Sequence, residues 1–230
     1  MTGAAYLPMR PSPGENATWQ LSTKVCRISQ FLAEETAELL LTRATRADQE
    51  DLFPSRVRGN QVDTRTRRAL SHVGFEAEEL TDAIHRVRGP VERALGISCE
   101  DTEPAFALNI HNDGDFYLPH QDVSSHEAAK GALAANRVVT FVYYMHRTPA
   151  AFSGGALRMY DTSAPLHMDG TLDPKECTYR DYAPEHNSVI FFAPSALHEV
   201  RRVSCPSRKR ADSRFAINGW LCRNPAVQEA

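Results

Sequence analysis

Residues 105–122 read AFALNIHNDGDFYLPHQD, and this stretch decides the fold. The apolar run at 105–110 is typical of a buried strand, and Asn112-Asp113-Gly114-Asp115 has the composition of a tight turn. A second strand follows from Phe116 to Leu118 and leads into His120-Gln121-Asp122. The stretch therefore predicts two strands joined by a turn, with candidate metal ligands at the end of the second.

Working outward from this pair, runs of β-branched and aromatic residues predict several more strands. They lie at Arg137 to His146, Gly155 to Tyr160, Ser188 to Phe192, His198 to Val203 and Ser213 to Leu221. Many short strands separated by loops are typical of a sandwich or a jelly roll. We therefore expect an all-β core over about residues 104–221.

Two helices are expected before this core, which makes the fold class α+β. Apolar residues lie among acids from Ile28 to about Ala44, and from Leu80 to Leu95 they recur every three or four positions. We expect Gly89-Pro90 to kink or divide the second helix, because proline removes a backbone donor and clashes with the preceding turn. The two helices would support the core over residues 28–97, within a single domain of residues 1–230.

The composition excludes several classes of protein. The 230 residues include 26 basic and 29 acidic side chains, and 42% of residues are hydrophobic. This balance is too apolar for a disordered chain and too even for a general nucleic-acid binder. No apolar run approaches the ~20 residues of a membrane span, and no signal peptide is evident. We expect a cytoplasmic protein with no membrane partner, whose five scattered cysteines stay reduced.

Three H-x-D triplets are candidate metal sites, beginning at His111, His120 and His167. Because a chain of this composition gives about half a match by chance, context must separate them. The triplet at His120 follows a strand, where residues i and i+2 point to the same side. With His198, which opens a later strand, His120 and Asp122 would form the facial triad of non-haem iron(II) enzymes. The other two triplets are expected to be surface or turn residues.

The order of several motifs resembles that of a known enzyme family. The motifs are FYLPHQD (116–122), RVVTFVYYM (137–145), GGALRMY (154–160), NSVIFF (187–192), LHEV (197–200) and RFAINGW (214–220). Together they are similar to the prolyl 4-hydroxylase-like 2-oxoglutarate/iron(II) dioxygenases. The resemblance implies a double-stranded β-helix (a cupin-like jelly roll) that uses Fe(II), 2-oxoglutarate and O2, with ascorbate as a candidate reductant. It also implies hydroxylation of a C–H bond with decarboxylation of 2-oxoglutarate to succinate and CO2.

The same resemblance implies roles for individual residues. His120, Asp122 and His198 would form the catalytic centre by holding the metal, and Arg214 would pair with the distal carboxylate of 2-oxoglutarate. The remaining pocket residues it implies are Thr140, Tyr144, Leu157 and Tyr117. Strand alternation independently places Thr140 and Tyr144 on one face of their strand and Tyr143 on the other.

Two departures from the family pattern concern this pocket. His111 stands near the position where relatives often have a tyrosine beside 2-oxoglutarate. The interval from His198 to Arg214 is longer than usual, and the extra loop contains Arg208 and Arg210. Either arginine could replace Arg214 in principle, but only Arg214 opens an apolar strand that directs its side chain into the barrel.

The substrate is left open between two classes. We favour a small molecule, such as an amino acid or a biosynthetic intermediate, because no peptide-binding module is evident. A prolyl hydroxylase acting on a protein or peptide is the alternative, and a non-enzymatic metal-binding jelly roll that senses or stabilises is a further one.

Basic residues concentrate around 56–68 and 201–214. If both segments reach the mouth of the pocket, the substrate would be anionic. The net charge of −3 disfavours a nucleic-acid partner.

Overall fold

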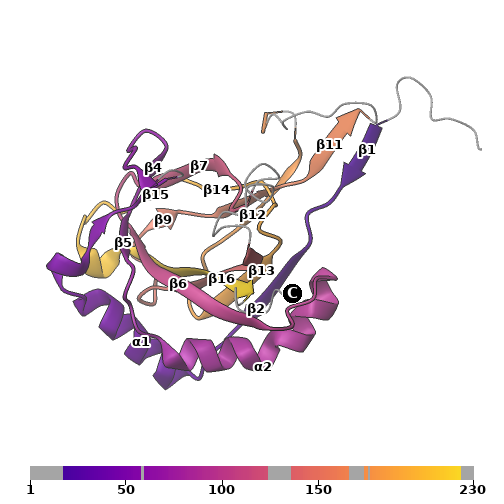
Figure 1. The fold of residues 1–230 in the computed structure, drawn as a ribbon. Coiled ribbons are helices and arrows are strands. Elements are labelled where there is room, and N and C mark those ends of the chain that lie inside the picture. The colour runs from indigo at the N-terminus through magenta and orange to yellow at the C-terminus, as the bar shows by residue number, and fades with distance from the viewer. Residues whose placement is uncertain (1–17, 58–59, 124–135, 166–173, 176, 224–230) are drawn as a thin grey trace, which may run out of the picture.

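A computed structural model describes residues 18–57, 60–123, 136–165, 174–175 and 177–223. Its centre consists of two antiparallel sheets, one of seven strands and one of five, with both helices beneath the larger sheet (Figure 1). A cluster of buried residues from both sheets, including Val142, Leu157 and Ile190, joins their inner faces. The arrangement is the expected all-β core with flanking helices.

The larger sheet has the strand order β2-β13-β8-β16-β6-β5-β3. Its strands are β2 (Val25–Ser29), β3 (Phe53–Pro54), β5 (Leu70–His72), β6 (Thr102–His111), β8 (Arg137–Met145), β13 (Ser188–Phe192) and β16 (Arg214–Arg223). Along β8, Phe141 and Tyr143 pack on the helix side, whereas Val142 and Tyr144 pack between the sheets. The predicted alternation of Tyr143 and Tyr144 is therefore confirmed.

The smaller sheet has the order β12-β10-β14-β7-β4. Its strands are β4 (Arg67–Arg68), β7 (Phe116–His120), β10 (Leu157–Tyr160), β12 (Tyr179–Tyr182) and β14 (His198–Val200). Two further pairs lie outside these sheets: β1 (Thr18–Leu21) with β11 (Thr162–Pro165), and β9 (Ser153–Gly154) with β15 (Val203–Ser204). β7 and β14 are neighbours in the smaller sheet, and this pairing positions the site described below.

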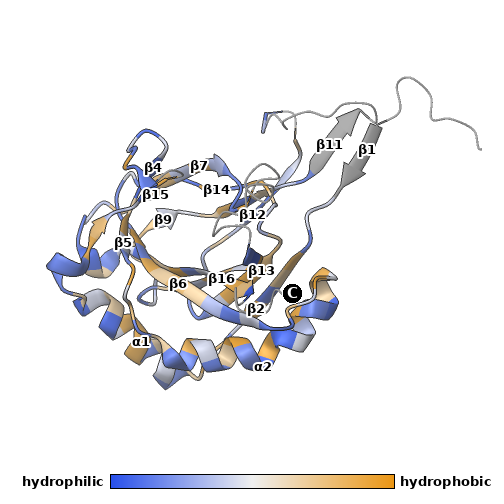
Figure 2. Ribbon diagram, in the orientation of Figure 1, coloured by the Kyte–Doolittle hydropathy of each residue, from blue (hydrophilic) through white to orange (hydrophobic). Residues whose placement is uncertain are grey.

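The helices α1 (Glu34–Arg46) and α2 (Glu78–Leu95) pack against the outer face of the larger sheet. Figure 2 shows apolar and polar residues alternating along both. Leu40 and Leu80 are fully buried, in one cluster with Phe141 of β8. Two short 3-10 helices, η1 (Gln49–Asp51) and η4 (Arg210–Asp212), lie in connections. No helix in the described part of the chain is long and apolar enough to cross a membrane.

The helix expected from Ile28 begins later than predicted. Val25–Ser29 form β2, which pairs antiparallel with β13, and α1 starts at Glu34. The chain between them is fixed by Asn187, whose carbonyl accepts from the Phe31 N–H and whose side-chain amide donates to the carbonyl of Leu32. Pairing with a strand far along the chain thus overrides the local helical pattern.

Of the two outcomes predicted at Gly89-Pro90, a division of the helix is wrong, because α2 runs through Pro90 without interruption. Two effects offset the cost of the proline, which is about 3 kcal/mol in a helix interior. Gly89 has no Cβ to clash with the proline ring. Val91 and Leu95, just beyond it, are buried in the core, and each contributes about 1.5–3 kcal/mol by burial.

Other differences are smaller. The strand predicted from His198 to Val203 is two strands, β14 and β15, separated by Arg201 and Arg202. The polar segment after Tyr160, expected to lack strands, contains β11. The triplet at His167 lies outside the described residues. As expected, Cys26, Cys99, Cys205 and Cys222 form no disulfide.

Candidate metal and co-substrate site

The three predicted metal ligands meet where β7 lies beside β14. His120 ends β7 and His198 begins β14, and the two residues are directly opposite in the antiparallel register. The Asp122 carboxylate lies 3.9 Å from Nε2 of His120 and 4.0 Å from Nε2 of His198. One ligand atom of each residue lies within 4.8 Å of the other two. A single ion can therefore contact two imidazoles and one carboxylate.

Backbone carbonyls orient both imidazoles. Nδ1 of His120 lies 2.9 Å from the carbonyl oxygen of Leu118, and Nδ1 of His198 lies 2.9 Å from that of Ala196. Because a carbonyl only accepts hydrogen bonds, each Nδ1 carries the proton, and the lone pair of each Nε2 is left for a metal. Tyr117 stacks on His120 with the ring centroids 3.5 Å apart, which further restricts that imidazole.

The environment gives these groups the charges that a divalent cation requires. Burial, and then the neighbouring His198, lower the pKa of His120 to about 3, so its ring is neutral near pH 7. Burial opposes ionisation of Asp122, but the facing imidazoles of His198 and His120 outweigh it and lower the pKa of the carboxyl. Two imidazole nitrogens and one carboxylate oxygen are the donor set of the non-haem iron(II) triad.

Asp122 lies beyond the end of β7, although it was expected on the strand. Its N–H donates to the carbonyl of Pro194 at 2.9 Å, which ties it to the turn before β14 and turns it toward His198. Thr140, expected among the residues around 2-oxoglutarate, lines the cavity and also donates from Oγ1 to Oδ2 of Asp122 at 2.7 Å. Thr140 thereby positions the carboxylate of Asp122, a predicted metal ligand.

Arg214 begins β16 and is 1% exposed. Its Nε donates to the carbonyl of Gly155 at 2.8 Å, and its Nη1 lies 3.3 Å from Nδ1 of His111, so both partners are neutral. Its guanidinium carbon lies 4.9 Å from the ring centroid of Tyr144, whose buried hydroxyl has no hydrogen-bond partner among the described residues. A buried guanidinium beside a free hydroxyl fits the distal carboxylate of 2-oxoglutarate.

His111 is not the surface or turn residue that its triplet predicts. It ends β6, opposite Arg214 in the register, and is 1% exposed. Burial, then the charges of Arg214 and Arg67, hold its pKa well below the usual range. Since Nδ1 accepts from Arg214, Nε2 carries the proton, and that buried N–H also lacks a partner among the described residues.

One cavity of about 870 Å³ connects the metal ligands with Arg214. Leu157 and Tyr117 line it with Thr140, while Tyr144 packs beside Leu157 in the buried cluster between the sheets. The structure thus brings every predicted site residue into or next to this cavity. Arg56 and Arg67, from the basic segment 56–68 considered for the mouth of the pocket, also line it. The lining residues that the sequence reasoning missed are Asn109, Arg137, Asn218 and Trp220.

Two of the cavity residues that were missed could have been predicted from the sequence. Asn218 and Trp220 follow Arg214 at even spacing on β16, so strand alternation places them on the same face. Arg67 lies on a strand of two residues within a polar stretch, where no periodicity marks it.

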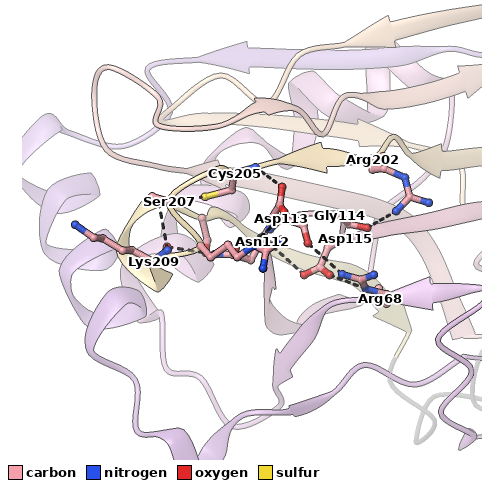
Figure 3. Close-up of polar contacts among 11 residues, drawn as sticks. Arg68, Asn112, Asp113, Gly114, Asp115, Arg202, Cys205, Ser207 and Lys209 are labelled. Atoms are coloured by element: carbon pink, nitrogen blue, oxygen red, sulfur yellow. Dashed lines mark hydrogen bonds and ion pairs between the residues drawn. The ribbon is translucent and has the colours of Figure 1, made fainter.

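Some arginines of the two basic segments meet at the turn between β6 and β7 (Figure 3), while Arg56 and Arg67 of the first segment and Arg214 of the second line the cavity. Arg68 Nε lies 3.2 Å from Asp115, Arg202 donates to the carbonyl of Gly114 at 2.7 Å, and Arg208 Nε lies 3.3 Å from Asp113. Asp113 also accepts from the N–H of Cys205, the backbone role expected of it. Three of the arginines are thus used within the fold, and Arg208 is no substitute for Arg214.

The sequence profile of the 2OG-Fe(II) oxygenase superfamily matches residues 106–222. An uncharacterized PKHD-type hydroxylase of Synechocystis sp. is 34% identical over 201 residues, which are 84% of this chain and 61% of that protein. This chain therefore spans less than two thirds of the length of that relative.

Solved structures are similar to the fold. A prolyl-4-hydroxylase of Pseudomonas putida has a TM-score of 0.60 at 19% identity, covering 88% of this chain and 94% of that one. A prolyl hydroxylase of Trichoplax adhaerens, in complex with a hypoxia inducible factor peptide fragment, has a TM-score of 0.64 at 17% identity, covering 91% and 89%. These likenesses confirm the jelly-roll fold, and the profile match confirms the expected enzyme family. The chain belongs to the 2OG-Fe(II) oxygenase superfamily.

Proposed function

We propose that this protein is an iron(II)- and 2-oxoglutarate-dependent dioxygenase that hydroxylates an unactivated C–H bond of a small molecule, such as an amino acid or a biosynthetic intermediate. 2-Oxoglutarate and O2 are its co-substrates, and ascorbate is a candidate reductant. One observation carries the proposal: a cavity has a two-histidine, one-carboxylate cluster on its wall and, beside it, a buried arginine with no carboxylate partner among the described residues.

The residues of the site would have distinct roles in binding and catalysis. His120, Asp122 and His198 would hold iron(II), which together with 2-oxoglutarate supplies the oxidising chemistry. Arg214, assisted by the hydroxyl of Tyr144, would bind and orient the distal carboxylate. Apolar side chains from the inner faces of both sheets, Leu157 and Val142, would exclude water from the co-substrate.

The size of the cavity favours a small substrate. Its volume of about 870 Å³ lies within the range of roughly 300–1,000 Å³ that is typical of small-molecule sites. 2-Oxoglutarate occupies only part of this space, so room is left for a compound of amino-acid size. The second candidate, hydroxylation of prolyl residues in a peptide or protein, is favoured by the two solved structures above, which are prolyl hydroxylases.

Succinate release tests both candidates. The iron-loaded protein would be incubated with 2-oxoglutarate, air and either an amino-acid panel or a prolyl-peptide panel, and the products examined by mass spectrometry. We expect stimulated succinate release and gain of one oxygen atom with a small molecule, and neither in Asp122→Ala. Oxygen gain confined to prolyl peptides would establish the second candidate. Metal-dependent stabilisation without succinate from either panel would instead favour the non-enzymatic alternative.

A further inference from the structure

Arg67 is a second arginine in the cavity that lacks a carboxylate partner among the described residues. Its Nη2 donates to Oδ1 of Asn109 at 2.6 Å, and its Nη1 donates to the backbone carbonyl of Arg56 at 2.9 Å. Both acceptors are neutral, and the buried Nε has no partner at all in the described part of the chain. Burial lowers the pKa of this guanidinium. Like Arg214, Arg67 therefore has only neutral hydrogen-bond partners, although its side chain is half-buried and that of Arg214 is fully buried.

The position of Arg67 sets it beside the metal ligands. On β4 it is directly opposite Tyr117 of β7, and its guanidinium carbon lies 4.7 Å from the centroid of the Tyr117 ring. Tyr117 in turn stacks on His120. A group bound by Arg67 would thus lie one aromatic ring away from the metal, on the side of the cavity away from the core.

Asn109 holds Arg67 without neutralising it. Its Oδ1 also accepts from Ser71 Oγ at 2.8 Å, and Ser71 lies 2.6 Å from Ser55 Oγ. This network fixes the guanidinium through neutral oxygens only. Because a guanidinium whose partners are all neutral keeps an uncompensated positive charge, Arg67 favours binding of an anion that reaches it.

The charge of the whole cavity supports an anionic ligand beyond 2-oxoglutarate. Among the residues that the structure describes, its lining includes four arginines (Arg56, Arg67, Arg137 and Arg214) and one acidic residue, Asp122. A divalent metal and the dianion of 2-oxoglutarate cancel each other, so the positive surplus persists after both have bound. Phe53 and Val73, exposed at the rim, and Phe106 and Trp220 make much of the remaining wall apolar.

We infer that Arg67 is the specificity-determining residue for the substrate, and that the substrate is a small monocarboxylate with an apolar body, its carboxylate bound by Arg67. This inference rests on the proposed function and narrows its substrate class. The carboxylate of the substrate would lie on the opposite side of the Tyr117 ring from the metal. The apolar body of the substrate would then carry the C–H bond that faces the metal.

Binding of a matched pair of probes tests it. Phenylacetate and phenylacetamide have the same shape but differ in charge, and their affinities for the anaerobic protein with iron(II) and 2-oxoglutarate can be measured by calorimetry. We expect the acid to bind about 10- to 100-fold more tightly than the amide. Arg67→Gln should abolish that preference, whereas Arg68→Gln, which changes the neighbouring but outward-facing arginine, should retain it.

Asn109→Asp provides a second test that keeps Arg67. It gives the guanidinium an internal carboxylate, which should weaken binding of the acid but not of the amide. The inference is overturned if the wild type does not prefer the acid, or if Arg67→Gln or Asn109→Asp retains the full preference. The absorbance of the iron(II)–2-oxoglutarate complex is recorded on the same samples. Its absence would contradict the proposed function, while the probe affinities would still decide the role of Arg67.

Discussion

Arg67 and Arg68 are neighbours on β4, yet their environments are opposite. Arg67 faces the cavity and contacts neutral oxygens, whereas Arg68 faces the β6–β7 turn and pairs with Asp115 (Figure 3). Strand alternation separates the two side chains, and the supply of carboxylates decides what each can do. The turn has Asp113 and Asp115, whereas Asp122 is the one carboxylate among the described residues that line the cavity. An arginine paired within the fold stabilises it, and an unpaired one in a cavity is left for a ligand.

The largest expected effect concerns an unpaired arginine in the cavity, Arg214. Arg214→Gln should raise the dissociation constant of 2-oxoglutarate about 100-fold or more, because losing one partner of a buried charge pair costs about 3–5 kcal/mol. Anaerobic calorimetry with iron(II) measures this. Arg208→Gln is the matched control, since the Arg208 side chain is 79% exposed and pairs with Asp113. An equal loss in both variants would contradict the assignment of Arg214.

Two glycines extend the comparison to the backbone. Gly155 and Gly114 both have positive φ, at +67° and +77°. A Cβ at Gly155 would lie 2.7 Å from Cδ of Arg214, whereas at Gly114 the nearest atom is the flexible end of Arg68, at 3.1 Å. Both alanine variants should lose about 1–2 kcal/mol of unfolding free energy.

Only Gly155→Ala should also weaken 2-oxoglutarate binding, by about tenfold or more, because it displaces the Arg214 side chain. Urea unfolding and calorimetry on the two variants separate these effects. If Gly114→Ala weakens 2-oxoglutarate as much as Gly155→Ala does, the cavity and the turn are not independent.

His111, buried beside the cavity arginines, is expected to make the free energy of unfolding depend on pH. Burial, then Arg214 and Arg67, keep its folded pKa well below the ordinary value of 6.5, so the unfolded chain takes up the proton first as the pH falls. The contribution of neutral His111 to the free energy of unfolding is therefore fully present above about pH 6.5, and it is lost as the pH falls toward the folded pKa. Between pH 7.5 and 5.5 the wild type should lose about 1.4 kcal/mol more than His111→Gln in urea unfolding. Equal losses would show that His111 is not held neutral.

The smallest effect is expected at the turn. Arg68→Gln removes an ion pair whose arginine side chain is 46% exposed, and such pairs contribute about 0–1 kcal/mol. Its unfolding free energy in urea should fall by no more than that, and 2-oxoglutarate affinity should not change. A loss above 2 kcal/mol, about twice the upper limit for surface pairs, would mean that the turn is a major support of the fold.

Local patterns account for what could be predicted from the sequence. His120-Gln121-Asp122 after a strand and Arg214 at the start of an apolar strand both carry their signal within a few residues, and the structure brings these residues to one cavity. The alternation along β8 likewise separated Tyr143 from Tyr144.

Features that depend on distant partners escaped prediction. β2 forms because β13 pairs with it, and His111 is buried because β16 places Arg214 opposite it. The sequence left open whether the basic residues around 201–214 reach the cavity, but at the β6–β7 turn Arg208 pairs with Asp113 and Arg202 donates to the carbonyl of Gly114. Arg67 faces the cavity only because β4 pairs with β7, and a strand of two residues has no readable period.

The central claim is that His120, Asp122 and His198 hold iron(II) beside a bound 2-oxoglutarate. Anaerobic titration of the protein with iron(II) and 2-oxoglutarate tests it most directly, through the metal-to-ligand charge-transfer band of the complex in the visible range. We predict the band in the wild type and in the control variant Asp113→Ala, whose carboxylate lies in the turn, and its loss in Asp122→Ala and His198→Ala. No band in the wild type, or an undiminished band in Asp122→Ala and His198→Ala, would contradict the claim.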